Sequence, residues 1–210
     1  MSTQNMSRKL LVTLTLFAFF AVSGVFYVQQ KNTNILPESP INKGGVNTAT
    51  PGMNTAGMSP LVSLPYNFGI EYPSKYYVQA KELDASTTPH LVVVMILDTQ
   101  ENRDLLDGKS NVARDGGTGI TINAYRNSSN LSAKDWAMQD TNWNVSNKTL
   151  VPTKVVGKDG VMFRWSGLYE GASVLLAHGD FVYVFAVSWE TPQDPILDDF
   201  DQILASLRFN

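Results

Sequence analysis

Residues 164–189 read RWSGLYEGASVLLAHGDFVYVFAVSW, and this stretch is the strongest indication of the fold. Two runs rich in β-branched and aromatic residues, Ser173–Ala177 and Phe181–Trp189, flank the tripeptide His178-Gly179-Asp180. A glycine at such a position permits the positive φ of a tight turn, so the pattern predicts an antiparallel hairpin. Both alternating sets of side chains in Phe181–Trp189 are apolar or small, which predicts an inner strand that is covered on both faces.

Further strand patterns lie upstream of this hairpin. The continuous β-branched run Leu91–Leu97 predicts a central strand that is buried on both faces. Pro73-Ser74-Lys75 predicts a tight turn between two short strands. The other predicted strands are Phe68–Pro73, Tyr76–Ala80, Gly119–Tyr125, Thr153–Val156 and Val161–Trp165, the last two joined by a turn at Lys158-Asp159-Gly160.

Two helices complete the predicted domain. Ser132, with Asp135 three residues later, resembles a capping box and predicts a helix that runs to about Asn142. Asp194 followed by Pro195 is a strong start signal for a second helix. Its expected apolar stripe is Ile196, Phe200, Ile203 and Leu207, and Asp198, Asp199 and Asp201 lie near the positive end of its dipole. Strands, helix, strands and helix in this order predict an α+β domain, an antiparallel β-sheet flanked by helices.

The N-terminal part of the chain has a different character. Leu10–Val28 is a run of 19 residues without a charge, long enough to cross a bilayer as one helix. Arg8 and Lys9 precede it, so the positive-inside rule places residues 1–9 in the cytoplasm and the rest of the chain beyond the membrane. Because the apolar run continues past Ser23, we expect an uncleaved signal anchor, with cleavage near Ser23 and secretion as the alternative.

Residues 29–60 are rich in Asn, Thr, Gly, Pro and Ser and show no apolar periodicity, which predicts a flexible linker. Residues 61–210 then form one extracytoplasmic domain, which holds 12 of the 16 basic and 18 of the 19 acidic residues and has a net charge of −6. An acidic domain lacks the electrostatic footprint of a nucleic-acid binder. The chain has no cysteine and no metal or nucleotide motif, so we predict no cofactor and no nucleic-acid partner.

Three parts of the domain resemble PsbP-like domains. They are FGIEYPSKYYV at residues 68–78, the hairpin series at 164–189, and the closing amphipathic helix that ends in SLRF at 206–209. The resemblance covers about residues 61–210 and implies an α/β/α sandwich around an antiparallel sheet. In photosynthetic members it implies a role in support of an oxygen-evolving photosystem. The membrane anchor and the linker depart from that setting, so no photosystem role and no metal-binding residues are transferred to this chain.

Candidate functional residues are few. Tyr169 lies in a predicted loop and is the aromatic residue most expected to be exposed, while His178 and Asp180 share a predicted turn and could together bind a ligand. These three are the candidate binding residues, and no catalytic residue is predicted. The sequence favours a membrane-tethered accessory or binding module with an envelope protein or polysaccharide as its partner. The alternative is a cell-envelope hydrolase that uses a carboxylate pair. It rests on the acidic stretch Asp98, Glu101, Asp104 and Asp107, which we otherwise interpret as a solvated loop.

Overall fold

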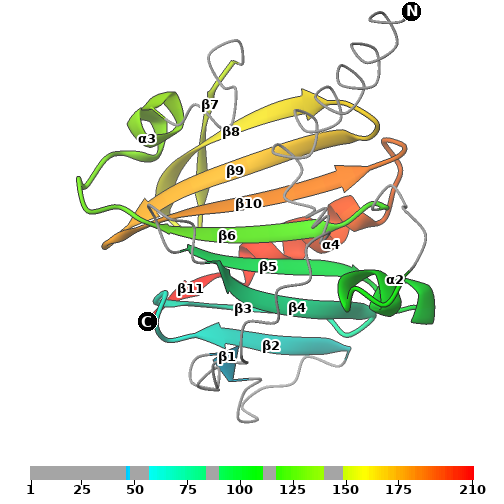
Figure 1. Cartoon of the computed structure of the whole chain (residues 1–210). Helices are drawn as coiled ribbons and strands as arrows, with labels where there is room; N and C mark the ends of the chain where they lie inside the picture. Colours follow the sequence, from blue (N-terminus) through cyan, green and yellow to red (C-terminus); the bar gives the residue numbers. More distant parts are fainter. Residues whose placement is uncertain (1–45, 48–56, 84–89, 111–116, 140–148) are drawn as a thin grey trace, which may run out of the picture.

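The computed structural model describes residues 46–47, 57–83, 90–110, 117–139 and 149–210 (Figure 1). A seven-stranded antiparallel sheet, the large sheet, has the order β4-β5-β6-β10-β9-β8-β7. Its strands are β4 (Tyr76–Leu83), β5 (His90–Leu97), β6 (Ile120–Arg126), β7 (Val151–Val155), β8 (Lys158–Ser166), β9 (Glu170–His178) and β10 (Phe181–Trp189). The expected α+β class with an antiparallel sheet is therefore confirmed.

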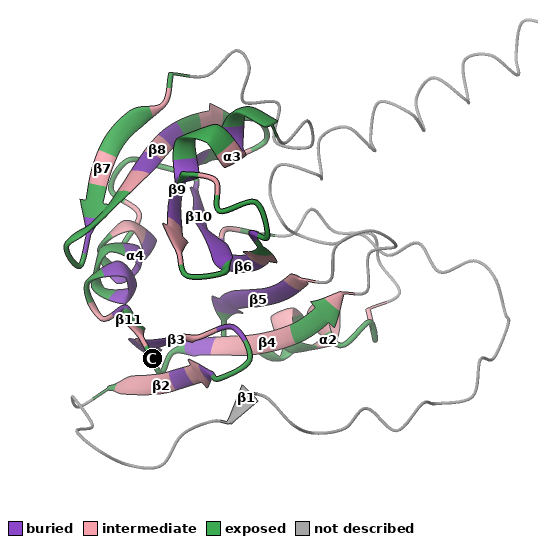
Figure 2. Ribbon diagram, turned by 90° about the vertical axis from the view of Figure 1, so that its left-hand side faces the viewer, coloured by how far each residue is buried: buried purple, intermediate pink, exposed green. Residues whose placement is uncertain are grey.

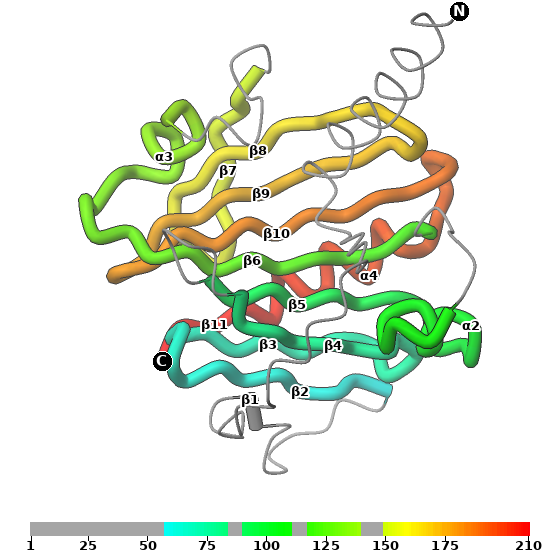
Figure 3. Tube along the Cα trace, viewed as in Figure 1, coloured from blue at the N-terminus to red at the C-terminus, as the bar shows by residue number. Residues whose placement is uncertain are grey.

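A second, small sheet has the order β1-β2-β3-β11. It consists of β1 (Val46–Asn47), β2 (Met58–Ser63), β3 (Phe68–Pro73) and β11 (Arg208–Phe209). The trace in Figure 3 shows the chain passing from β3 into β4, and so from the small sheet to the large one. At the other end of the chain, β11 returns to pair antiparallel with β3. The C-terminus thus lies beside β3 in the small sheet.

Helices lie on both faces of the large sheet (Figures 1 and 2). The helices of the described residues are α2 (Gln100–Leu106), α3 (Ala133–Gln139) and α4 (Ile196–Ala205). We call the face that packs against α4 and the small sheet the inner face, and the opposite one the second face. Side chains of α3 and α2 pack against the second face, in two separate apolar clusters.

The inner face of β10 forms the centre of the core. Five alternating residues of β10 belong to this core: Phe181, Tyr183, Phe185, Val187 and Trp189. Tyr183 is fully buried, and its hydroxyl donates a hydrogen bond of 2.8 Å to the backbone carbonyl of Tyr66. Burial raises the pKa of Tyr183 well above its usual range. All nine residues of β10 are buried, so the expected inner strand is confirmed.

The two hairpins at the end of the sheet differ in how well local sequence predicted them. The β9–β10 turn consists of Gly179 and Asp180, with φ +54° at Gly179, as expected. The β7–β8 turn is at Val156-Gly157, where φ is 43° and 79°, and not at Lys158-Asp159-Gly160 as predicted. A two-residue turn of this kind needs positive φ at both central residues. Gly160 instead lies within β8, where a Cβ atom would meet the carbonyl oxygen of Leu175 at 2.4 Å.

Helix α3 begins as the sequence predicts. The Ser132 hydroxyl oxygen accepts a hydrogen bond of 3.1 Å from the Asp135 backbone N–H and donates one of 2.6 Å to the Asp135 carboxylate. The expected end of this helix near Asn142 lies outside the described residues. Leu10–Val28 also lies outside them, and among the helices that the structure does describe none has the length and apolar character of a membrane span.

Three elements lie where the sequence predicted loop or linker, the first of them β1 at Val46–Asn47. Strand β2 begins at Met58, three residues before the expected start of the domain at residue 61, and pairs with β3 over its whole length. Helix α2 occupies part of the acidic stretch that was expected to be a solvated loop, so that expectation was wrong. Its N-cap is Thr99, whose hydroxyl accepts a hydrogen bond of 3.2 Å from the Asn102 backbone N–H. A cap that stands before a helix of only seven residues is a weak sequence signal.

Helix α4 is fastened to the edge of the large sheet by a buried carboxylate. Asp199, which the sequence pattern assigned to the helix dipole, is only 6% exposed. Its Oδ2 accepts a hydrogen bond of 2.5 Å from the Tyr76 hydroxyl and lies 2.7 Å from Lys75 Nζ. Burial, followed by the hydrogen bond to Asp199, raises the pKa of Tyr76 far above its usual range. The phenol therefore remains a donor at any physiological pH.

We predict that Tyr76→Phe lowers the free energy of unfolding by about 1 to 3 kcal/mol, because Asp199 would remain buried with one partner fewer. Tyr77→Phe is the matched control. The Tyr77 hydroxyl also donates to a carboxylate, that of Asp107, but does so at an exposed site. Equilibrium denaturation by urea measures both variants. Equal effects of the two substitutions would contradict the special role of the buried pair.

We also predict that His178 makes stability depend on pH. Its ring packs 4.2 Å from the Phe209 ring, between centroids, and burial lowers the pKa of His178, with a smaller contribution from Lys158. The pKa of His178 is lower in the folded state than its unfolded value near 6.5, so its full contribution to stability is present above that pH. This contribution declines as the pH falls below the unfolded value, because the unfolded state then binds more protons. Melting temperatures measured from pH 7.5 to pH 5 should fall less steeply in His178→Gln and in Lys158→Met. Parallel profiles in all three proteins would refute this.

Candidate functional site

The three binding residues expected from the sequence do not form one site. Tyr169 precedes β9 and is partly buried, whereas His178 ends that strand. They are nine positions apart along the chain, about 30 Å at the usual rise of an extended strand. His178 packs against Phe209, and Asp180 is exposed in the turn, where its carbonyl accepts a hydrogen bond of 2.7 Å from the Asn127 N–H. His178 and Asp180 therefore take part in joining elements of the fold.

A different set of residues stands out on the second face of the large sheet. Four neutral polar residues lie there on the three central strands, and we call them the polar row: Thr121, Asn123, Ser173 and Ser188. In the strand register, Thr121 and Ser173 both pair with Ala186 of β10, and Asn123 pairs with Val184. The exposed fraction of each polar-row residue is between 0% and 8%. The row is therefore a set of buried polar groups on a sheet face where burial normally favours apolar side chains.

Two members of the polar row are satisfied by neighbours. The Ser188 hydroxyl accepts a hydrogen bond of 3.1 Å from the Gly119 N–H and approaches the Gly119 carbonyl oxygen at 3.4 Å. The Ser173 hydroxyl accepts one of 3.1 Å from Trp165 Nε1. The indole ring of Trp165 lies against Gly171, where a Cβ atom would meet the ring at 2.1 Å. Glycine at this position thus lets the tryptophan lie flat on the sheet beside the row.

The other two members each carry one side-chain atom that has no hydrogen-bond partner among the described residues. Thr121 Oγ1 and Asn123 Nδ2 make no hydrogen bond within the part of the chain that the structure describes, although both residues are only 3% exposed. The third such atom among the described residues is Ser63 Oγ, on the small sheet. An unsatisfied buried polar group costs about 1 to 3 kcal/mol, so each instance in a folded protein calls for a functional or structural reason. Thr121 and Asn123 are two residues apart on β6, so the cost of both unsatisfied atoms falls on one site.

Aromatic rings border the polar row at the Asn123 end. Tyr125 is two residues further along β6 and so shares the second face with Asn123. Its ring stacks on that of His90 with centroids 4.6 Å apart, and the ring of Trp136 from α3 lies 5.1 Å away. The second-face side chains of β6, β9 and β10 are all uncharged. A ligand at this face would meet amide and hydroxyl groups between apolar and aromatic walls, which is the usual composition of a ligand site.

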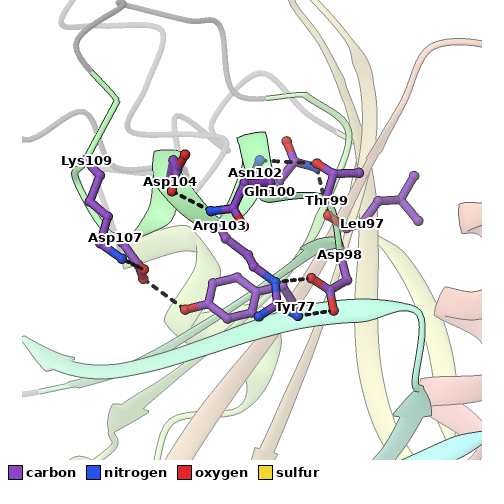
Figure 4. A network of polar contacts seen from close by, with 10 residues as sticks. All are labelled: Tyr77, Leu97, Asp98, Thr99, Gln100, Asn102, Arg103, Asp104, Asp107 and Lys109. Carbon is purple, nitrogen blue, oxygen red and sulfur yellow. Dashed lines mark hydrogen bonds and ion pairs between the residues drawn. The ribbon is translucent and has the colours of Figure 1, made fainter.

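The acidic stretch forms a separate polar network around α2 (Figure 4). Arg103 makes a bidentate ion pair with Asp98, with Nη2 2.6 Å from Oδ2, and stacks over the Tyr77 ring at 5.2 Å. The Tyr77 hydroxyl donates a hydrogen bond of 2.9 Å to Asp107, which also pairs with Lys109 at 2.8 Å. These side chains thus link α2 to β4 and to the end of β5.

The electrostatics of this network do not suit acid catalysis. Hydrogen bonding to Arg103 lowers the pKa of Asp98, and hydrogen bonding to Lys109 and then Tyr77 lowers the pKa of Asp107. A glycosidase needs the opposite for one carboxyl group, whose pKa must be raised so that it remains protonated. Within the described residues, no group of three or more His, Asp or Glu side chains could hold a metal ion. The acidic stretch is therefore better suited to fastening α2 than to chemistry.

Comparison with known proteins yields structural likeness only. No protein-family model and no curated protein sequence matches the chain. The structure is similar to the solution structure of cyanobacterial PsbP (CyanoP) from Synechocystis sp. PCC 6803, with a TM-score of 0.49 and 10% identity over 77% of this chain and 98% of that one. It is also similar to a crystal structure from Bacteroides thetaiotaomicron VPI-5482, with a TM-score of 0.44 and 11% identity over 74% of this chain and 49% of that one. The first of these structures is a PsbP protein, the family that the sequence resembles.

Proposed function

We propose that this chain is a membrane-tethered binding or accessory module, and that its partner contacts the polar row on the second face of the large sheet. The observation that carries the proposal is the pair of unpartnered polar atoms, Thr121 Oγ1 and Asn123 Nδ2. A partner with a hydrogen-bond acceptor, such as a carbonyl oxygen, would satisfy the Asn123 amide and remove the cost of burying it. The free protein then carries a local instability that binding relieves.

The surroundings of the polar row favour an uncharged partner. Val92 and Val94 of β5 stand beside Asn123 and Thr121 in the register, and Val184 and Ala186 of β10 stand on their other side. A charged group would lose its hydration here without meeting an opposite charge. We therefore favour an extended segment of an envelope protein, whose main-chain carbonyls are neutral acceptors, over a charged polymer.

The tether supports a partner at the membrane. Leu10–Val28 has the length of a membrane span, and residues 29–45, which precede β1, would allow the domain to reach out from the bilayer. The net charge of −6 on residues 61–210 disfavours adsorption of the domain to anionic lipids. We propose that the anchor holds the domain near envelope partners without laying it on the lipid surface.

We predict that Thr121→Val and Asn123→Leu leave stability unchanged or raise it by up to about 1 kcal/mol, because each removes an unsatisfied group from a buried site. Ser188→Ala should instead lower stability by about 1 kcal/mol, since the Ser188 hydroxyl bonds with Gly119. Urea denaturation of the full chain measures all three. A loss of more than about 1 kcal/mol in both Thr121→Val and Asn123→Leu would show that Thr121 Oγ1 and Asn123 Nδ2 have partners after all.

The same variants test the function itself. Photocrosslinked membranes should yield one envelope protein with the full chain, and its recovery should fall at least about tenfold with Asn123→Leu, as expected for the loss of one buried hydrogen bond to the partner. Ser63→Ala is the matched control, because it removes the third unpartnered atom at a site on the other sheet. Equal recovery with Asn123→Leu and with Ser63→Ala would refute the site. Recovery of a polysaccharide in place of a protein would refute the choice of partner.

A further prediction concerns the side of the membrane on which the domain lies. Protease added to intact spheroplasts should cut within residues 29–60 and release a fragment of the size of the domain. Arg8→Gln with Lys9→Gln should make the orientation less uniform, because the flanking charges direct it. A domain that resists protease in spheroplasts and is cut only after lysis would show the reverse orientation.

A further inference from the structure

Helix α2 is held to the domain mainly by exposed polar contacts. It has seven residues and none of them is buried. Leu106 alone among its residues belongs to an apolar cluster, the group of Val92, Val94 and Ile96 on β5. A helix of two turns is not stable by itself in water, so its contacts with the rest of the domain decide whether it forms.

The contacts that fasten α2 are of a kind that salt weakens. The Arg103 and Asp98 side chains are 47% and 30% exposed, and those of Lys109 and Asp107 are 66% and 26% exposed. Figure 4 shows these groups arranged around Tyr77, with Arg103 above its ring and Asp107 at its hydroxyl. Ion pairs at this exposure contribute little and lose strength as the Debye length falls from about 10 Å at 0.1 M to about 3 Å at 1 M salt.

An apolar strip on the second face, formed by Val92, Val94 and Ile96 of β5, lies next to the polar row. Val92, Val94 and Ile96 are between 3% and 7% exposed, although they lie on the second face and not in the main core. In the strand register, Val92 pairs with Asn123 and Val94 with Thr121. Leu106 of α2 packs against this cluster, so displacement of α2 would remove one of the side chains that shield the residues next to Thr121 and Asn123.

We propose that α2 is a cover that opens when its ion pairs are weakened, and that its opening gives a partner access to the polar row from the β5 side. The part of this inference that concerns a partner rests on the proposed function, while the opening of α2 does not. The polar row is too deeply buried for a partner to reach it by surface contact alone. Helix α2, whose Leu106 packs against the β5 residues that border the row, is the route that we infer.

Hydrogen exchange on the full chain in nanodiscs tests the opening. The Arg103 and Asp107 amides donate to Thr99 and Arg103 carbonyls within this helix. Their exchange should rise about fivefold between about 0.05 M and about 1 M sodium chloride, as expected for the loss of one exposed ion pair. The amide of Ser206 at the end of α4 should not change, because α4 is held by apolar packing and by the buried Asp199.

Variants separate the ion pair from general loosening. Arg103→Met should give fast exchange in α2 at low salt and abolish the salt effect, whereas Lys154→Met should alter neither. Lys154 also forms an exposed pair, with Asp159 at 2.9 Å, but on the β7–β8 hairpin. Exchange in α2 that is insensitive both to salt and to Arg103→Met would overturn the proposal.

Access to the strip is measured separately with the neutral fluorescent probe N-phenyl-1-naphthylamine. Its emission should rise with salt in the unaltered chain and be high at any salt in Arg103→Met. Faster exchange without an increase in probe binding would show that α2 opens but does not control access. This result would overturn the proposal that α2 acts as a cover. Partner recovery that falls with Asn123→Leu but does not change with Arg103→Met would refute the cover while leaving the proposed function intact. Partner recovery that changes with Arg103→Met but not with Asn123→Leu would refute the proposed function alone.

Discussion

Strand β10 must be shielded from water on both of its faces, and the rest of the structure is arranged around that requirement. Its nine residues are all buried, and five of them belong to the main core. A single sheet cannot meet such a demand, because each strand exposes alternate side chains to opposite sides. The inner face is covered by α4 and the small sheet, and α3 packs on the second face. The same constraint places β10 in the middle of the large sheet, where β6 pairs with one of its edges and β9 with the other.

The two faces of the large sheet are not equivalent, and the difference points to where function resides. On the inner face of the large sheet, Tyr183 is matched by the Tyr66 carbonyl and Tyr76 by Asp199, while on the opposing small sheet Ser63 Oγ has no partner among the described residues. On the second face, Thr121 Oγ1 and Asn123 Nδ2 lie together on one strand, and neither has a partner in the described part of the chain. Proteins generally pair their buried polar groups, and the places where they break such a rule are expected to be functional sites. The polar row is the clearest such departure among the described residues.

The elements that cover the second face also differ in how they are attached. Helix α3 contributes Ala133 and Ala137 to a cluster of buried side chains, so its attachment depends on the hydrophobic effect. Helix α2 contributes no buried residue and depends on charges that are exposed to solvent. Parts of a protein with few buried apolar contacts are those that open locally. A likeness of fold carries no information on this point, because function depends on the particular side chains of a site.

Patterns among neighbouring residues were enough to predict much of the fold. Alternation and β-branching identified β5, β6 and β10, and Ser132 and Asp194 marked the starts of α3 and α4, because these signals act over only a few positions. The same local reasoning placed the β7–β8 turn at the wrong glycine, since Gly157 and Gly160 are equally plausible until the register is known. It also missed α2, whose few residues carry too little periodicity.

The site required the tertiary structure. Thr121 and Asn123 are ordinary strand residues in the sequence, and only the pairing with β5 and β10 shows that they are enclosed without partners. The role of Asp199 was hidden for the same reason, because its partner Tyr76 is 123 positions away. The candidate residues Tyr169, His178 and Asp180 come from a short stretch of sequence, and the structure places Tyr169 at one end of β9 and the other two at its opposite end. The sequence by itself determined which segments become strands and helices, because propensity and periodicity are local. Only the packing of the sheets decided which polar groups are buried, paired or left for a partner, because burial depends on contacts between distant parts of the chain.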